Sequence, residues 1–246
     1  MVRVLCAALV LVAHASAQPS ASPAYRIESL AGGERELRER FDERQIGILE
    51  QLNRRDLRYL ARLKEIVVPA AWHEDEREYS PLPHQFAWAV EHPKAIVVHQ
   101  PWQVFGAYEN GVLVRWGAVS SGRRSAPTPA GLFHLNWRSR GRCSTVCADW
   151  YMPWYWNFDN RRGLALHQFT LPGHPASHSC IRLLERDARW LYDWGEGWQL
   201  DADGRTVLRP GTPLLIVGEY DFDAPPPWRS PEALANGLVL PAGPPG

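Results

Sequence analysis

Hydrophobic residues near the start of the chain recur at helical spacing. Between residues 33 and 52 they fall on one face of a helix, with charged residues available for the opposite face; the apolar positions are Leu37, Phe41, Ile48, Leu49 and Leu52. Leu57, Leu60 and Leu63 continue this spacing, and residues 66–69 form a short run of β type. Because residues 18–24 have the Ser, Ala and Pro composition of a linker, we predict a small helical module over residues 18–69.

From residue 94 the hydrophobic residues form short runs of the kind found in strands. The predicted strands are 95–98, 104–108, 112–116, 132–135, 164–168 and 214–217. Asn110-Gly111 between two of them marks a tight hairpin turn. One helix is predicted at about 184–194, with apolar residues facing inward and Gly195 at its end. The domain over residues 94–218 is therefore predicted to be mainly β.

Two segments lack a clear periodicity. Residues 70–93 carry charges and two prolines, so we expect a connecting segment that covers the surface of the β domain. Residues 219–246 are rich in proline, and we expect a loosely held tail.

The first 17 residues have the order of a secretory signal peptide. Arg3 precedes about ten apolar residues, and the segment ends in Ala15-Ser16-Ala17. The apolar run is too short to span a bilayer; a membrane anchor is the alternative. Cleavage after Ala17 leaves no predicted transmembrane anchor, and we expect the mature protein in the periplasm or cell envelope.

Composition narrows the classes of function. Lys and Arg together number 27, as do Asp and Glu, so the formal net charge is zero and no broad field attracts nucleic acid or an anionic membrane. Neither a G-x-G-x-x-G segment, a Walker loop nor a zincin helix motif occurs, which argues against nucleotide chemistry and thermolysin-like hydrolysis.

Three cysteines follow the predicted cleavage site, and an odd number in an oxidising compartment leaves one thiol unpaired within the chain. Cys143 and Cys147 lie close together and could close a small loop as a disulfide. Two unpaired loop cysteines and a zinc half-site are the alternatives, although C-x3-C without a second close pair is weak metal spacing. Cys180 is then the free thiol.

Cys180 stands in the stretch Ser-His-Ser-Cys-Ile-Arg, where several groups could favour its thiolate. His167 lies 13 residues upstream on a predicted strand, and the loop 170–176 can bring it back to the cysteine. We expect the thiol just before the predicted helix, whose positive end could hold a thiolate or an oxyanion. A buried structural thiol and a metal site with the nearby histidines are the alternatives. We predict neither a metal nor a cofactor.

These residues resemble the signature of the YkuD-type L,D-transpeptidase domain, in which a histidine is followed by S/T-H-G-C and often I-R. The matching positions are His167 and residues 177–182. Upstream, residues 120–122 resemble the family's S-x-G, and residues 128–133 resemble its T-P-x-G-x-F. The resemblance covers residues 94–218. It implies a β-sandwich-like catalytic domain with one helix after the nucleophile.

The resemblance also implies a two-step acyl transfer on peptidoglycan. Cys180 would attack the carbonyl between the third and fourth residues of a tetrapeptide stem, expel D-alanine and hold a thioester. An amine of a second stem would resolve the thioester as a 3-3 cross-link. His167 would be the general base and acid, oriented by the backbone carbonyl of Gln168, and the N–H of Ser179 would donate to the oxyanion. Three further side chains are expected to bind substrate: Ser177, His178 and Arg182.

Two positions depart from the family pattern. Ser179 stands where the family has glycine, and Gln168 stands where a glycine usually follows the first histidine. If Ser179 holds a positive φ, it carries roughly 1–3 kcal/mol of strain that glycine avoids. The segment between His167 and Ser177 is also shorter than we expect of the family.

Two other regions resemble parts of cell-wall proteins. The aromatic run at residues 150–156, together with residues 138–147, resembles the family's lid, and Trp154 and Trp156 are expected to contact substrate; core packing is the alternative. The order strand, helix, helix, strand over about residues 25–69 loosely resembles a LysM sugar-binding module. A packing module without a ligand is the alternative there.

We therefore expect a secreted, cysteine-dependent L,D-transpeptidase that acts as a monomer on peptidoglycan stems. An L,D-carboxypeptidase would use the same residues with water as the acceptor. A non-catalytic peptidoglycan-binding protein would instead rely on the N-terminal module and the Trp cluster, and its binding to the wall would not depend on Cys180.

Overall fold

The computed structural model describes residues 23–244 apart from residues 145 and 148. The expected signal peptide, residues 1–17, lies outside the described residues. Within the described part of the chain, no helix combines the length and the apolar character needed to cross a membrane.

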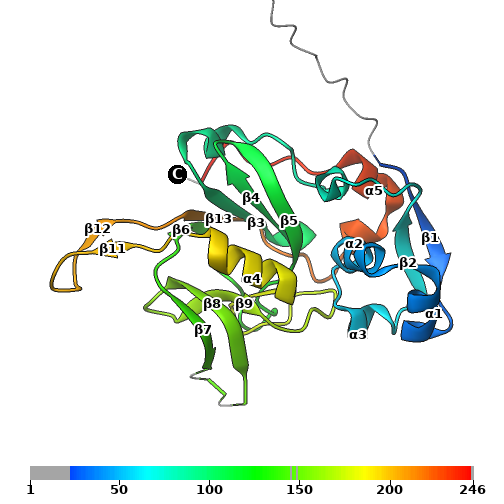
Figure 1. Ribbon diagram of the computed structural model, residues 1–246, viewed down its shortest axis with the longest axis horizontal. Coiled ribbons are helices and arrows are strands. Elements are labelled where there is room, and N and C mark those ends of the chain that lie inside the picture. Colours follow the sequence, from blue (N-terminus) through cyan, green and yellow to red (C-terminus); the bar gives the residue numbers. More distant parts are fainter. Residues whose placement is uncertain (1–22, 145, 148, 245–246) are drawn as a thin grey trace, which may run out of the picture.

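A nine-stranded sheet dominates the described residues, with the strand order β6-β13-β3-β4-β5-β10-β9-β8-β7. Its strands are β3 (Ala95–His99), β4 (Val104–Glu109), β5 (Val112–Ser120), β6 (Gly131–His134), β7 (Arg138–Cys143), β8 (Tyr151–Asp159), β9 (Leu164–Gln168), β10 (Ile181–Leu183) and β13 (Pro213–Val217). Figure 1 shows this sheet curled, with the helix α4 (Glu185–Trp194) packed beside it. The domain is mainly β, as the sequence predicts.

The hairpin of β4 and β5 shows how local sequence fixes the sheet. Asn110 and Gly111 both have a positive φ, at 47° and 84°. Two consecutive residues in this region form the tight turn whose twist matches that of the flanking strands. The predicted Asn-Gly turn is confirmed.

Both faces of the central strands are buried, which explains their near-continuous hydrophobic sequences. In β3, Ala95 and Val97 join one core cluster, whereas Ile96 and Val98 join another. The helix α4 contributes Leu191 to the second cluster. The first cluster is completed by residues from the connecting segment, the N-terminal module and the tail.

The N-terminal module consists of a two-stranded antiparallel sheet and three short helices. Its elements are β1 (Tyr25–Ser29), α1 (Gly33–Arg40), α2 (Glu43–Asn53), α3 (Leu57–Leu60) and β2 (Glu65–Pro69). The prediction of one helix over 33–52 is wrong, because Asp42 starts a second helix. Its carboxylate accepts from the Gln45 backbone N–H at 2.7 Å, and the Gln45 side chain accepts from the Asp42 N–H at 3.0 Å.

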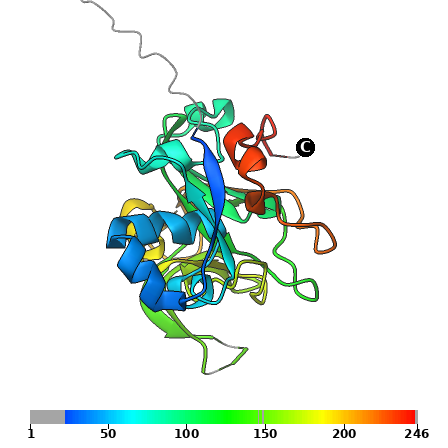
Figure 2. The same ribbon diagram turned by 90° about the vertical axis from the view of Figure 1, so that its right-hand side faces the viewer.

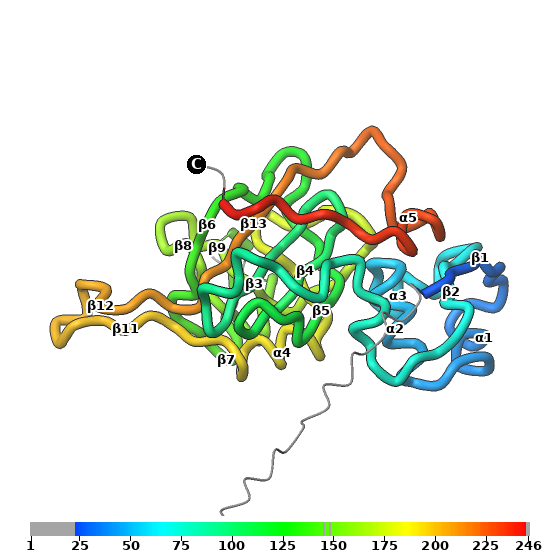
Figure 3. Tube along the Cα trace, turned by 90° about the horizontal axis from the view of Figure 1, so that it is seen from above, coloured from blue at the N-terminus to red at the C-terminus, as the bar shows by residue number. Residues whose placement is uncertain are grey.

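The module packs directly against the β domain, as Figure 3 shows from above. Arg54 is fully buried at the contact, and its Nε donates to the Trp102 carbonyl at 3.0 Å. Gln51 donates to the Trp116 carbonyl at 3.2 Å, and Arg186 of α4 pairs with Glu50 at 2.6 Å. Because backbone and charged groups meet across the contact, the module and the β domain form one packed unit.

The proline-rich tail is held firmly, contrary to the loose tail that its composition suggests. It contains a 3-10 turn (Pro227–Arg229) and the helix α5 (Pro231–Asn236), which Figure 2 shows beside β1. Trp228 and Leu234 are buried in the main core. Two apolar side chains therefore anchor a segment whose prolines alone indicate little structure.

The other short elements lie at the edges of these units. Residues 70–93 include two 3-10 turns, Glu76–Tyr79 and Ala87–Glu91, and their Tyr79 and Ala89 are buried against the sheet. A third 3-10 turn, Gln100–Trp102, follows β3. A small hairpin of β11 (Gln199–Leu200) and β12 (Val207–Arg209) projects from the β domain in Figure 1.

Candidate active site

The parallel pairing of β9 and β10 brings together the two ends of the loop that separates His167 from Cys180. Ile181 lies opposite Leu166, and Arg182 lies opposite His167. Side chains alternate between the faces of a strand, so Cys180 and Arg182 share a face with His167, while Ile181 and Leu166 enter the core. Both Cys180 and His167 line one cavity.

One expectation about the local structure is wrong. Cys180 precedes the strand β10, and α4 begins only at Glu185. Ile181 and Leu183 are fully buried, and their strand pairs with β5 and β9. The apolar alternation after the cysteine therefore forms a strand, and the positive end of α4 is not adjacent to the thiol.

The imidazole of His167 is held in one orientation. Its Nδ1 lies 2.9 Å from the carbonyl oxygen of Gln168, so Nδ1 carries the proton and Nε2 is the free acceptor. Burial lowers the pKa of His167 to about 4, the hydrogen bond to Gln168 opposes this shift, and the charge of Arg182 adds to it. The ring is therefore neutral at pH 7 and can accept a proton.

Cys180 is a free thiol that is protonated in its buried surroundings, so a base is required to ionise it. Burial raises its pKa, and a backbone hydrogen bond at Ala165 and the charge of Arg182 oppose that shift. Its Sγ also lies 4.0 Å from the Gly163 carbonyl oxygen, a weak contact that a thiol proton can make. A neutral base on the same face is the group that can take the thiol proton.

The turn before Cys180 has the positive φ at Ser179 that would carry strain in a residue other than glycine. Ser179 has a φ of 74°, in the left-handed region that favours glycine. Its hydroxyl donates to the Ala126 carbonyl at 3.1 Å, and its carbonyl accepts from the Thr128 hydroxyl at 3.0 Å. The Ser177 hydroxyl donates to the Cys180 carbonyl. The serine thus replaces glycine at a position that its neighbours hold in place.

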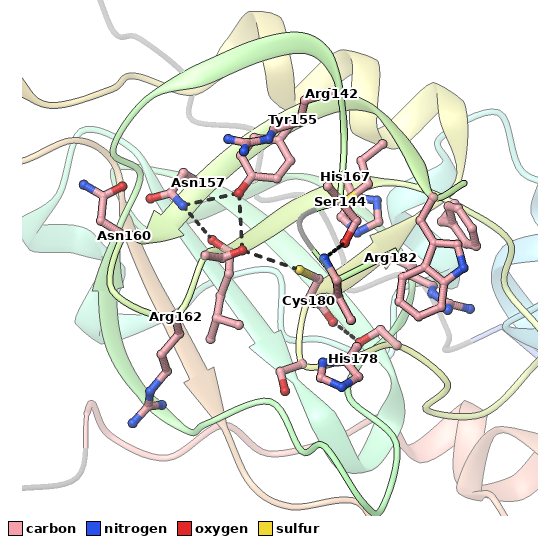
Figure 4. Close-up of a pocket in the computed structure, with 18 of the residues that line it drawn as sticks. Arg142, Ser144, Tyr155, Asn157, Asn160, Arg162, His167, His178, Cys180 and Arg182 are labelled. Atoms are coloured by element: carbon pink, nitrogen blue, oxygen red, sulfur yellow. Dashed lines mark hydrogen bonds between the residues drawn. The ribbon is translucent and has the colours of Figure 1, made fainter. Parts of the chain in front are cut away.

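The cavity around these groups has a volume of about 680 Å³. One wall comes from the hairpin of β7 and β8, in the position expected for the lid, and Figure 4 shows Arg142, Tyr155 and Asn157 pointing from it. Arg142 stacks over the Tyr155 ring at 5.1 Å. The Tyr155 hydroxyl donates to the Gly163 carbonyl at 3.3 Å, which joins the hairpin to the residues beside Cys180.

The charged side chains that line the cavity are basic. No Asp or Glu side chain is among the described residues that line it, whereas four arginines are: Arg142, Arg161, Arg162 and Arg182. The Arg182 guanidinium lies 4.6 Å from the Phe169 ring centre and 3.5 Å from the Thr170 carbonyl oxygen. Only Arg162 of the four pairs with a described carboxylate, that of Asp159 at 3.9 Å. A cavity of this kind attracts anionic groups.

The other expected substrate contacts divide into two groups. Ser177 and His178 line the cavity with Cys180. Trp154 and Trp156 do not: the Trp156 indole donates to the Leu191 carbonyl at 3.1 Å, and Trp154 packs on Tyr192 at 5.5 Å. Both tryptophans therefore face α4.

A break in the alternation of strand β8 explains why Trp154 and Trp156, which were expected to contact substrate, do not line the cavity. Trp154 has a φ of 55°, and Met152 and Tyr155 both face the cavity although they are three residues apart. The described aromatic residues that do line it are Trp137, Trp150, Tyr155 and Phe169. Of the four cavity arginines, Arg182 was expected from the sequence, whereas Arg142, Arg161 and Arg162 were missed. The Arg-x-Arg-x-Arg spacing of residues 138–142 was a signal for a basic strand, and its last arginine lines the cavity.

The expected disulfide between Cys143 and Cys147 is not formed, and both cysteines are free. Cys143 ends β7 opposite Tyr151. Nor do three His, Cys, Asp or Glu side chains gather as possible metal ligands anywhere in the described chain, so the zinc half-site has no second half there. The two cysteines thus stay as unpaired thiols at the end of the hairpin.

The β domain matches one known family model. Residues 93–216 match the model of the L,D-transpeptidase catalytic domain, YkuD. A search of the curated proteins finds no match.

Solved structures similar to this chain are L,D-transpeptidases. One from Xylanimonas cellulosilytica is 26% identical over 58% of this chain and 66% of its own, with a TM-score of 0.43. One from Stackebrandtia nassauensis is 22% identical over 53% of this chain and 58% of its own, also with a TM-score of 0.43. One from Mycobacterium tuberculosis is 22% identical over 51% and 58%, with a TM-score of 0.40. This chain spans about three fifths of the length of the first solved structures it matches.

Substitution of Ser179 tests the balance of strain and hydrogen bonding at the turn. Ser179→Ala keeps the positive φ and loses the bond to Ala126, so it is expected to lower the free energy of unfolding by about 1 kcal/mol. Ser179→Gly loses the same bond but relieves strain of about 1 kcal/mol, so it is expected to be nearly neutral. Urea unfolding measures both; a glycine variant less stable than the alanine variant would contradict this reading.

The buried neutral His167 makes stability depend on pH. Its pKa is about 4 in the folded chain, against about 6.5 when unfolded, so between these values only the unfolded chain binds the proton. Stability is expected to fall as the pH drops from 7 towards 4, by up to about 1.4 kcal/mol per pH unit.

Burial also lowers the pKa of His99 to about 4, so His99 adds to the loss of stability at low pH. The variant His167→Gln keeps the contribution of His99 and removes that of His167. Urea unfolding at pH 7 and pH 5 should show a larger loss for the wild type than for the variant. Equal losses would mean that His167 is not buried as a neutral ring.

Proposed function

Because the chain belongs to the YkuD family of L,D-transpeptidase catalytic domains, we propose that it cross-links peptidoglycan stems through a thioester on Cys180. The observation that carries this proposal is the shared face of β9 and β10, on which a free thiol and a neutral, oriented imidazole line one cavity. The alternation of strand residues supports the pairing of the two groups, because it places both on the face of the sheet that borders the cavity.

In the first step the Nε2 of His167 takes the Cys180 proton as Sγ attacks the carbonyl between the third and fourth stem residues. A C–S bond forms, and the carbonyl becomes a tetrahedral oxyanion. The protonated imidazole then gives its proton to the departing nitrogen, the C–N bond breaks, and D-alanine leaves. The Gln168 carbonyl stabilises the imidazolium through the Nδ1 proton, as it holds the neutral ring.

In the second step an amine of another stem attacks the thioester. Neutral His167 accepts a proton from this amine, the new C–N bond forms, and the C–S bond breaks to return the Cys180 thiol. The balance of both steps requires no metal, cofactor or redox partner, because each proton passes through His167. The product is a 3-3 cross-link; attack by water would yield a free tripeptide instead.

The nucleophile turn offers donors for the oxyanion. Among the described residues, no acceptor meets the backbone N–H of Ser179 or that of Cys180. The positive φ of Ser179 sets the direction of these groups, and the bonds to Ala126 and Thr128 hold it. One such donor contributes about 3–4 kcal/mol to transition-state stabilisation in a serine protease. We assign both N–H groups this role.

The basic cavity suits a peptide stem, which carries carboxylates. Arg182 is the arginine closest in sequence to the thiol, and its guanidinium is fixed by the Phe169 ring and the Thr170 carbonyl. We assign Arg182 to a substrate carboxylate, with Ser177 bracing the turn and His178 at the exposed rim. The signal-like start of the sequence supports a location of this activity in the cell envelope.

Turnover of a purified tetrapeptide muropeptide tests the proposal. The wild type should release D-alanine and form a dimer lighter than two monomers by one D-alanine, as read by mass spectrometry. Cys180→Ala should abolish this product, by at least about 10³-fold. Cys143→Ala is the matched control, because that thiol is exposed and free, and it should keep full activity.

The products also separate the alternatives. Tripeptide without dimer would show an L,D-carboxypeptidase, in which water replaces the second stem. Unchanged activity in Cys180→Ala, or wall binding by a wild type that converts no stem, would overturn the cysteine mechanism.

A further inference from the structure

We propose that Asp56, in the N-terminal module, is a positioning residue for the reaction at Cys180 and His167. It acts through the loop that joins β9 to β10. This inference rests on the proposed function for its chemistry, and on contacts between the module and the loop for its structure.

Asp56 binds the loop by two hydrogen bonds that run in opposite directions. Its carboxylate Oδ2 accepts from the Leu171 N–H at 2.8 Å, and its own N–H donates to the Leu171 carbonyl at 3.1 Å. The next residue along the loop, Pro172, forms an isolated bridge with Arg55. Leu171 is fully buried, so this contact is protected from water.

The side chain of Arg55 also lies close against the loop backbone at Gly173. Its φ is 87°, and a side chain there would come within 2.6 Å of the Arg55 guanidinium carbon. Glycine therefore allows Arg55 to lie against the loop. The loop and the turn of the module, residues 55–56, fit together along residues 171–173.

The carboxylate of Asp56 is itself fixed from the module side. Its Oδ1 accepts from the Tyr59 N–H at 3.1 Å, which caps α3. Glu50 accepts from the Leu57 N–H at 2.7 Å and pairs with Arg186 of α4. The two oxygens of Asp56 thus bind different segments, because Oδ1 caps the helix and Oδ2 holds the loop.

The anchored part of the loop carries three groups that meet the candidate active site. The Gln168 carbonyl orients His167, the Phe169 ring lies against the Arg182 guanidinium, and the Thr170 carbonyl accepts from Arg182. These residues directly precede Leu171. β10 also holds this part, because Gln168 pairs with Leu183 and the Phe169 N–H donates to the Leu183 carbonyl at 3.2 Å. The contact with Asp56 is thus a second support, next to Thr170, for the carbonyl that accepts the His167 proton.

The far half of the loop is held by the sheet and does not depend on Asp56. The Ser120 hydroxyl donates to the His174 carbonyl at 2.8 Å, and the Ala176 N–H donates to the Ser121 carbonyl at 3.0 Å. Loss of the Asp56 contact should thus affect the His167 side of the site and spare the turn of Ser179.

Asp56→Asn separates the helix-capping role of the carboxylate from its contact with the loop. Asparagine caps helices as well as aspartate does, so its oxygen can keep the bond to the Tyr59 N–H. Its NH₂ group then replaces Oδ2 and faces the Leu171 N–H, a donor against a donor. Asp42→Asn is the matched control, because Asp42 caps α2 in the same way and binds no residue of the loop.

We expect Asp56→Asn to lower kcat for the muropeptide about tenfold to hundredfold, with KM changed less than about twofold, because the base is misplaced while the cavity is intact. Asp42→Asn should keep the kcat of the wild type. Asp56→Ala, measured where circular dichroism shows it folded, should lose at least as much kcat as the asparagine variant.

A second readout does not depend on the substrate. Alkylation of Cys180 by iodoacetamide, followed against pH by peptide mass mapping, should require a higher pH in Asp56→Asn than in Asp42→Asn. Equal kcat and equal alkylation profiles in these two variants would overturn the inference. A wild type without turnover would instead count against the proposed function, and the alkylation profiles would still decide the role of Asp56.

Discussion

The parallel pairing of β9 with β10 is the constraint on which the rest of the site depends. It sets Cys180 and Arg182 on the same face as His167, although a loop separates these residues along the chain. Parallel neighbours need a crossover connection, and here that connection is a short loop in place of a helix. The loop must therefore be held by other parts of the molecule, and both the sheet and the N-terminal module hold it.

Side-chain and backbone hydrogen bonds hold the turn before Cys180 in a conformation that glycine would adopt more easily. Ser179 keeps a glycine-like φ because Ala126 and Thr128 bind it on both sides. Ser121 also accepts from the Ser177 N–H at 3.0 Å. The two upstream stretches that resemble family motifs, residues 120–122 and 128–133, therefore each contact the nucleophile turn.

Much of the fold and part of the site could be predicted from local sequence. The Asn110-Gly111 turn and the apolar strands depend on neighbouring residues, and these predictions are confirmed. The positive φ at Ser179, which the sequence raised only as a condition for strain, is present. The hydrogen bond from His167 to the Gln168 carbonyl was expected from the family resemblance alone, and the structure contains it.

Features that depend on distant contacts could not be predicted in this way. The faces of Trp154 and Trp156 follow from one left-handed residue in β8, and the burial of Trp228 follows from a core formed by three parts of the chain. The bond between Asp56 and Leu171 joins residues 115 positions apart. Hydrophobic periodicity carries no information on such pairs, because it describes each segment by itself.

The proposed reaction requires that one thiol, that of Cys180, is activated by His167 to attack a carbonyl. A carbapenem offers a strained amide carbonyl to such a thiol, and ring opening leaves a stable adduct that intact-protein mass spectrometry detects. We expect one adduct on the wild type, none on Cys180→Ala and much slower labelling of His167→Gln. An adduct that persists in Cys180→Ala and maps to Cys143 or Cys147 would contradict it.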